Sequence, residues 1–230
     1  MVSRRYRRHP SYYPNTLLRI LKWPVAVLSV ISLPIYLSEW INSPLWSLSF
    51  KALHRPLLGL VIYAIIWRLI LSRRVMGTYF STFEHELTHA IFAWLTLHRV
   101  VGLQVTWNNG GQCIYEGDGE GNWLISIAPY WFPTLLFPVI IIESITHTAF
   151  LQYGVGIVMG YHLLSTWREL HPRQTDLHKT GFLFAWVFLP SATLGVYHSA
   201  LAYTFFGTQA ALDAGFSPLI KACSKILSLG

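Results

Sequence analysis

Two histidines and a glutamate in residues 77–97 have the types and spacing of a metal site. His85 and His89 are four residues apart, so on a helix they lie one turn apart on the same face and can both bind one zinc ion. Glu86 follows the first histidine, where its carboxylate can accept a proton from a water molecule that the metal activates. The pentapeptide HELTH therefore has the HExxH pattern of zinc hydrolases and predicts Glu86 as the catalytic base.

The residues around this motif are apolar. Apart from Glu84 and the three residues above, residues 77–97 are almost all apolar or small and uncharged. A helix of this length would be about 31 Å long, enough to cross a bilayer. Ionisable side chains in a membrane are costly and usually mark a function. The alternative is that these groups only satisfy one another inside a helical bundle, which does not explain their metal-ligand spacing.

The segment FEHELTHAIFAWL, with the strand-like stretch and Gly-Gly turn that follow it, resembles the site-2 protease family of intramembrane zinc metalloproteases. The resemblance covers residues 77 to about 181. Members of that family are polytopic and cleave membrane-anchored proteins within or near the bilayer. The resemblance implies a zinc metalloendopeptidase that hydrolyses a peptide bond of a membrane-anchored protein substrate.

Composition also indicates an integral membrane protein, because 53% of the 230 residues are hydrophobic and only 12% are charged. The net charge is +7, but the basic cluster at residues 4–8 precedes the first apolar run. It is typical of a cytoplasmic anchor or of contact with anionic lipid headgroups, and we expect no nucleic-acid partner. We expect a multi-pass protein of the cell (inner) membrane. The two cysteines are far apart and predict neither a disulfide nor a metal site.

The apolar runs predict an all-α polytopic fold with about six transmembrane helices and a small β-hairpin after the motif helix. We expect a basic arm at residues 1–16, a membrane-embedded domain at 17–207 and an interfacial tail at 208–230. Prolines predict a broken helix within residues 123–145. Gly156 and Gly160 have the spacing of closely packed helices. The candidate spans are residues 17–41, 56–71, 77–97, 123–145, 147–164 and 180–206.

Residues 101–107 alternate apolar side chains with small or polar ones, and the sequence NNGG at 108–111 is a strong turn signal. They predict a β-hairpin. In the resembled family, a re-entrant hairpin lies beside the catalytic centre, where a strand edge can pair with an unwound substrate. A plain surface hairpin fits the sequence equally well. Asn108 and Asn109 either assist oxyanion or substrate binding or serve the turn.

A hydrolytic zinc site normally has three protein ligands, so His85 and His89 need a third. In the resembled family this is an aspartate on a later transmembrane helix, and Asp176 in the sequence QTDL matches it best, although Leu177 stands where the family has glycine. The best alternative is His162, which can instead form a structural hydrogen bond between helices. The remaining candidates are Glu143, His147, Glu169, His171 and His178.

Two other functions fit the composition. One is a non-catalytic membrane relative that binds substrate helices or zinc, but the intact Glu86 argues against it. The other is an ion relay, which would need more ionisable residues along the spans than the sequence has. Orientation is open. Basic residues favour a cytoplasmic amino terminus, so six spans would place Asp176 outside, whereas the resembled family has its centre toward the cytoplasm. A first segment that does not cross would reconcile the two. Oligomeric state and substrate identity stay open.

Overall fold

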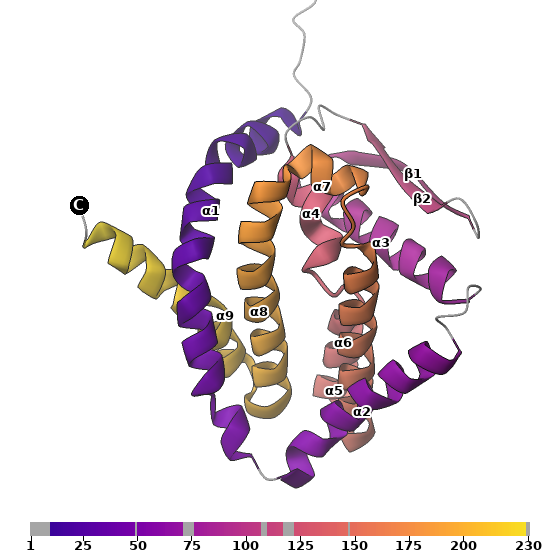
Figure 1. The fold of residues 1–230 in the computed structure, drawn as a ribbon, viewed down its shortest axis with the longest axis vertical. Helices are drawn as coiled ribbons and strands as arrows, with labels where there is room; N and C mark the ends of the chain where they lie inside the picture. Colours follow the sequence, from indigo (N-terminus) through magenta and orange to yellow (C-terminus); the bar gives the residue numbers. More distant parts are fainter. Residues whose placement is uncertain are drawn as a thin grey trace, which may run out of the picture.

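A computed structural model describes residues 10–48, 50–70, 76–106, 110–116, 122–146 and 148–228. It confirms the predicted class, a helical protein with a small antiparallel hairpin directly after the motif helix (Figure 1). In chain order the elements are α1 (Tyr12–Ile41), the 3-10 turn η1 (Pro44–Ser47), α2 (Phe50–Leu69), α3 (Met76–Leu95), β1 (Arg99–Thr106), β2 (Gly110–Glu116), α4 (Trp123–Ile127), the 3-10 turn η3 (Ala128–Tyr130), α5 (Leu136–Thr146), α6 (Ala149–Glu169), α7 (Thr175–Thr180), α8 (Phe182–Phe206) and α9 (Thr208–Leu227).

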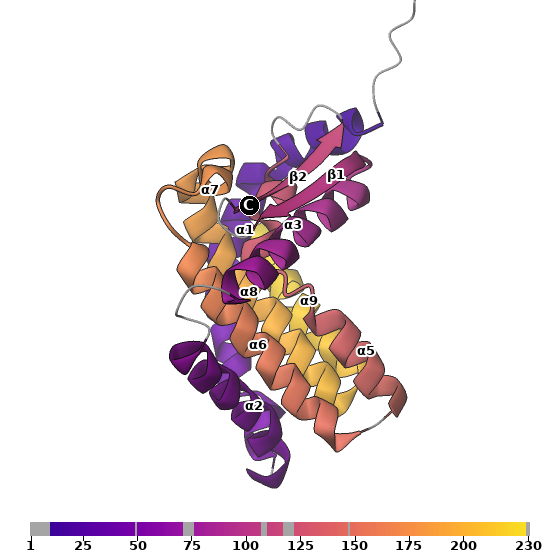
Figure 2. The ribbon, with the colours of Figure 1, turned by 90° about the vertical axis from the view of Figure 1, so that its right-hand side faces the viewer.

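The long helices form two packed groups. Helices α1, α8 and α9 pack together, and α6 packs against both α2 and α5. Helices α3, α4 and α7 and the hairpin gather at one end of this array, the upper end in Figures 1 and 2. This end of the molecule carries the HExxH motif of α3.

Three segments of the described chain are long and apolar enough to cross a membrane, namely Tyr12–Ser47, Ala52–Leu69 and Phe182–Phe206. They support an integral membrane protein. Helices α3 and α6 are 20 and 21 residues long, but they carry too many polar side chains to belong to this group. The number of about six spans therefore stays a prediction.

The predicted break in residues 123–145 is present. The chain forms α4, the 3-10 turn η3 and then α5, with Pro129 inside η3 and Pro133 before α5. A proline donates no backbone hydrogen bond and clashes with the preceding turn, so two prolines four residues apart favour a break here. Asn122 starts α4, because its side chain accepts a hydrogen bond from the Ile125 N–H at 3.2 Å. The break brings α4 and η3 beside α3.

Close packing at Gly156 and Gly160 is also confirmed. A Cβ atom at Gly156 would overlap the backbone of Pro56 on α2, and one at Gly160 would lie 3.3 Å from the Leu60 carbonyl oxygen. From the other side, a Cβ at Gly59 would overlap the Tyr153 backbone. Small residues on both helices thus let the backbones of α2 and α6 touch.

The hairpin pairs Arg99 with Glu116 at one end and Thr106 with Gly110 at the other. Residues 107–109, which include the first two residues of the predicted turn, lie outside the described residues. The predicted hairpin is confirmed. Val101 is 48% exposed, because an irregularity of the ladder between Val100 and Gly102 shifts the side-chain phase.

The two ends of the described chain are helical. Helix α1 begins at Tyr12, inside the predicted arm, because Pro14 falls in its first turn, where a missing N–H costs nothing. At the other end, α9 exposes Leu212, Phe216 and Ile220. The division into an arm, a membrane-embedded domain and an interfacial tail stays a prediction.

Candidate metal centre

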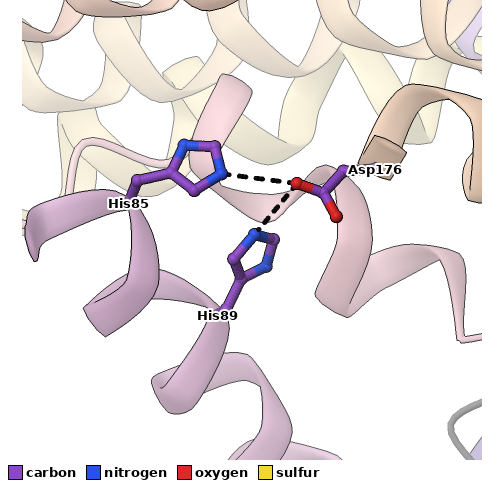
Figure 3. A group of neighbouring side chains, drawn as sticks. All are labelled: His85, His89 and Asp176. Carbon is purple, nitrogen blue, oxygen red and sulfur yellow. Dashed lines mark hydrogen bonds and ion pairs between the residues drawn. The ribbon is translucent and has the colours of Figure 1, made fainter. Parts of the chain in front are cut away.

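The side chains of His85, His89 and Asp176 point toward one another (Figure 3), at the end of the molecule where α3 and α7 lie. Asp176 Oδ2 lies 3.4 Å from His85 Nε2 and 3.3 Å from His89 Nε2. Within the described ranges these three form the group of histidine, cysteine and acidic residues that could hold a metal, with one atom of each lying within 4.8 Å of the others. The structure thus brings together the three residues that the sequence and the resemblance selected as ligands.

This donor set fits zinc. Two imidazole nitrogens and a carboxylate oxygen are a common ligand set of hydrolytic zinc sites. Ligand atoms around one tetrahedral zinc are about 3.3 Å apart, given bonds of about 2.0–2.1 Å, and the Nε2 to Oδ2 distances of 3.4 and 3.3 Å match this. The three side chains are at most 18% exposed. Zinc would therefore be held in a largely buried site at the end of the helix array.

The Nδ1 atom of each histidine has its own partner. His85 Nδ1 lies 2.7 Å from Glu169 Oε2 at the end of α6, and His89 Nδ1 lies 2.8 Å from the Ile125 carbonyl oxygen on α4. Both partners accept, so Nδ1 carries the proton and Nε2 is free to bind a metal. The sequence named Glu169 only as a possible third ligand. Its carboxylate lies on the opposite edge of the His85 ring.

The middle of α3 is fixed to the chain before α5. Thr88 Oγ1 donates to the Glu84 carbonyl oxygen at 2.8 Å and contacts Thr134 Oγ1 at 2.5 Å. The buried Glu84 carboxylate lies near the backbone N–H groups of Thr134 and Leu135. These contacts hold the helix that carries both histidines, and they give a structural role to the second acidic residue of this helix.

Glu86 lies beneath strand β2. A Cβ atom at Gly111 would lie 2.6 Å from Glu86 Cγ, so only glycine lets the strand pass this closely. The Cys113 backbone N–H lies near the Glu86 carboxylate. Glu86 and Asp176 both line two cavities, of about 380 and 470 Å³, which meet at the metal centre. Glu86 thus lies where the three candidate metal ligands meet the two cavities.

A family comparison agrees with this geometry. The sequence model of the family described as Peptidase M50B-like matches residues 57–219. The chain belongs to this family. The match runs from α2 into α9 and includes the motif helix, the hairpin and α7. It confirms the resemblance to site-2 protease-like peptidases and indicates an intramembrane metalloprotease. No curated protein and no solved structure matches the chain.

In this M50B-like chain, His162 has a structural role. Its Nδ1 contacts the Tyr197 hydroxyl, and its Nε2 lies 3.1 Å from the Pro129 carbonyl oxygen. Both ring nitrogens are therefore occupied away from the metal centre, as the second interpretation of this residue expected. Glu143, His171 and His178 also lie outside the metal group, whereas His147, Asn108 and Asn109 fall outside the described residues.

Proposed function

We propose that this protein is a zinc-dependent intramembrane endopeptidase that hydrolyses a peptide bond of a membrane-anchored protein. The observation that carries the proposal is the approach of Asp176 Oδ2 to both histidine Nε2 atoms beside Glu86, in a chain of a peptidase family. His85, His89 and Asp176 would hold the zinc. When bound, zinc supplies Lewis-acid activation of water and of the peptide carbonyl.

Glu86 is the proton carrier of the proposed reaction. Its carboxylate accepts the proton of the attacking water and then delivers it to the departing amine. The Cys113 N–H and the close passage of Gly111 hold the carboxylate at the junction of the two cavities. A substrate segment can extend into a cavity on each side of that junction.

Strand β2 supports binding of an extended substrate. In the described residues the sheet has two strands, so β2 pairs with β1 along one edge only. Residues of β2 line both cavities. A helical peptide bond is shielded from attack, whereas a segment that pairs with a strand edge presents its carbonyl groups. We therefore propose that the substrate unwinds beside β2.

The substrate and the location follow from the apolar helices. Helices α1, α2 and α8 support an integral membrane protein, and a substrate anchored in the same bilayer reaches the centre without crossing water. We propose the cell (inner) membrane as the location. The alternative, a non-catalytic relative that binds substrate helices or zinc, predicts that changing Glu86 has no chemical consequence.

The test compares zinc content and cleavage of a transmembrane reporter in wild type, Glu86→Gln and Asp176→Asn, reconstituted in liposomes. We expect Glu86→Gln to keep its zinc but lose cleavage by about 10²–10⁴-fold, the usual contribution of a general base. Asp176→Asn should lower both zinc content and cleavage. Asp213→Asn, at an exposed residue of α9 that bonds to Gln209, is the control. Undiminished cleavage by Glu86→Gln would exclude the assigned base, and full zinc content in Asp176→Asn would exclude Asp176 as a ligand.

A further inference from the structure

The two cavities at the metal centre form one groove with two arms. They share Glu86, Gly111, Thr175 and Asp176, so they meet at the centre itself. The first, the α6 arm, has a volume of about 380 Å³ and includes residues from the end of α6. The second, the α7 arm, has a volume of about 470 Å³ and follows β2 toward its carboxyl end. A peptide bond at the centre would thus have one flanking segment in each arm.

Among the described residues, each arm is lined by one arginine or lysine. Arg168, exposed in the last turn of α6, lines the α6 arm, and within the described ranges it forms no ion pair. Lys179 lines the α7 arm with a side chain that is 69% exposed, and its Nζ lies 4.0 Å from Asp176 Oδ1. Both cations can therefore turn toward a bound segment.

The acidic side chains of the groove are already engaged. Asp176 faces both histidines, Glu169 contacts His85 Nδ1, and Glu86 lies covered by strand β2 at Gly111 and near the Cys113 backbone. None of these three carboxylates is free to attract a basic substrate residue. The charges left for side-chain recognition by the described part of the groove are thus positive in both arms.

We propose that the groove selects segments with acidic side chains on both sides of the scissile bond, with Arg168 recognising one side and Lys179 the other. The position of the scissile bond rests on the proposed function. Exposed charge pairs contribute modestly, so each acidic residue is expected to increase affinity about two- to fivefold.

The inference is tested by binding, without cleavage. The probes are fluorescein-labelled peptides of about ten residues with an uncharged apolar centre, carrying Asp, Asn or Lys on one side or on both. They are titrated by fluorescence anisotropy against zinc-loaded Glu86→Gln protein in nonionic detergent. For each position, we expect the peptide with Asp to bind about two- to fivefold tighter than the peptide with Asn. The peptide with Lys should bind more weakly than the peptide with Asn. Because the side chains are exposed, the preference should decrease from about 50 mM to about 500 mM salt.

Single variants assign the arms. Arg168→Gln should abolish the preference on one side of the peptide and Lys179→Gln the preference on the other. Arg173, in the loop between α6 and α7, lines neither arm. Arg173→Gln also removes one positive charge, so this variant should keep both preferences. Equal binding of the Asp and Lys peptides would overturn the inference, as would an equal effect of Arg173→Gln. Thermal unfolding checks that all variants are folded.

This outcome is separable from that of the proposed function. A chain that prefers acidic peptides but whose wild type cleaves no transmembrane reporter would contradict the peptidase and keep the charge selection. A wild type that cleaves acidic and basic reporters at equal rates would contradict the charge selection and keep the peptidase.

Discussion

Each histidine of the metal centre is held at one nitrogen and free at the other. The Nδ1 partner of His89 is the backbone carbonyl of Ile125, at 2.8 Å, which a side-chain substitution does not remove. The Nδ1 partner of His85 is the Glu169 carboxylate, at 2.7 Å. The orientation of His85, unlike that of His89, therefore depends on one replaceable side chain. Such carboxylate–histidine pairs fix the ring and raise its basicity toward a metal.

Glu169→Ala is expected to weaken zinc binding about 10–100-fold, because His85 loses the partner that fixes its tautomer. Glu169→Gln should restore part of this affinity, since its amide oxygen can also accept from Nδ1–H. Competition with a zinc chelator measures both. Glu116→Ala removes a carboxylate that pairs with Arg99 on the hairpin and serves as the control. Wild-type zinc affinity in Glu169→Ala would show that this carboxylate does not orient the ligand.

The reactivity of the Cys113 thiol depends on its own pKa and on whether a peptide occupies the α7 arm. Burial, with repulsion from Glu86 as a smaller cause, raises the pKa of its thiol from 9.0 to about 11. A raised thiol pKa keeps the reactive thiolate scarce, so iodoacetamide labelling of Cys113 should rise about tenfold per pH unit from about pH 7 to pH 9 without levelling off. A peptide in the α7 arm should protect Cys113 but not the exposed Cys223. A labelling rate for Cys113 that levels off below pH 9 would contradict the shift.

At the scale of elements, the site depends on how closely β2 approaches α3. A Cβ atom at Gly111 would lie 2.6 Å from both Glu86 Cγ and Thr82 Cγ2 and 2.9 Å from Glu86 Oε1. A strand that carried any side chain at this position would therefore displace the Glu86 carboxylate or lift away from the helix. The hairpin is thus part of the site and more than a connection between two helices.

Gly111→Ala is expected to reduce reporter cleavage at least about tenfold, because small displacements of catalytic groups are costly. The matched control is Gly102→Ala on β1, where the new methyl group would lie 3.6 Å from the nearest atom, Ile114 Cδ1. Zinc content should stay near wild type in both variants, since neither glycine contacts the three ligands. If Gly111→Ala cleaved as fast as Gly102→Ala, the close approach of β2 would be irrelevant to Glu86.

The sequence predicted those elements whose signals are local. Four-residue spacing placed His85 and His89 on one helix face, and alternation followed by a Gly-Gly turn placed the hairpin after it. Asp176 followed from the family resemblance, but its element did not, because it lies on the short helix α7 and not on a long span. The Glu169 contact joins residues 84 positions apart. No local pattern encodes such tertiary pairings.

At the scale of the whole molecule, the metal centre lies level with the ends of the apolar helices. Asp176 precedes the start of α8 at Phe182 by six residues, less than two helical turns. On the other side, Asn122 Nδ2 donates to Asn15 Oδ1 at 2.8 Å and Trp123 Nε1 to the Leu18 carbonyl at 2.7 Å, which ties α4 to the first part of α1. Figure 1 shows α3, α4 and α7 together at this end. Helices α1 and α8 are both apolar enough to cross a membrane, so we expect this end to lie at one boundary of the bilayer.

A substrate should therefore be cleaved near the end of its transmembrane segment. The test uses two reporters that carry one cleavable sequence either at the boundary or at the centre of a leucine-rich span. The two positions differ by about ten residues, or about 15 Å, which is half the hydrocarbon thickness. We expect the boundary reporter to be cleaved at least about tenfold faster, because a central bond cannot reach Glu86 and the metal ligands without pulling its span out of the lipid. The same sequence without an anchor is the control, and its slower cleavage would measure what the shared bilayer contributes. Fastest cleavage at the centre of the span would place the metal centre deep in the bilayer and contradict its position at the helix ends.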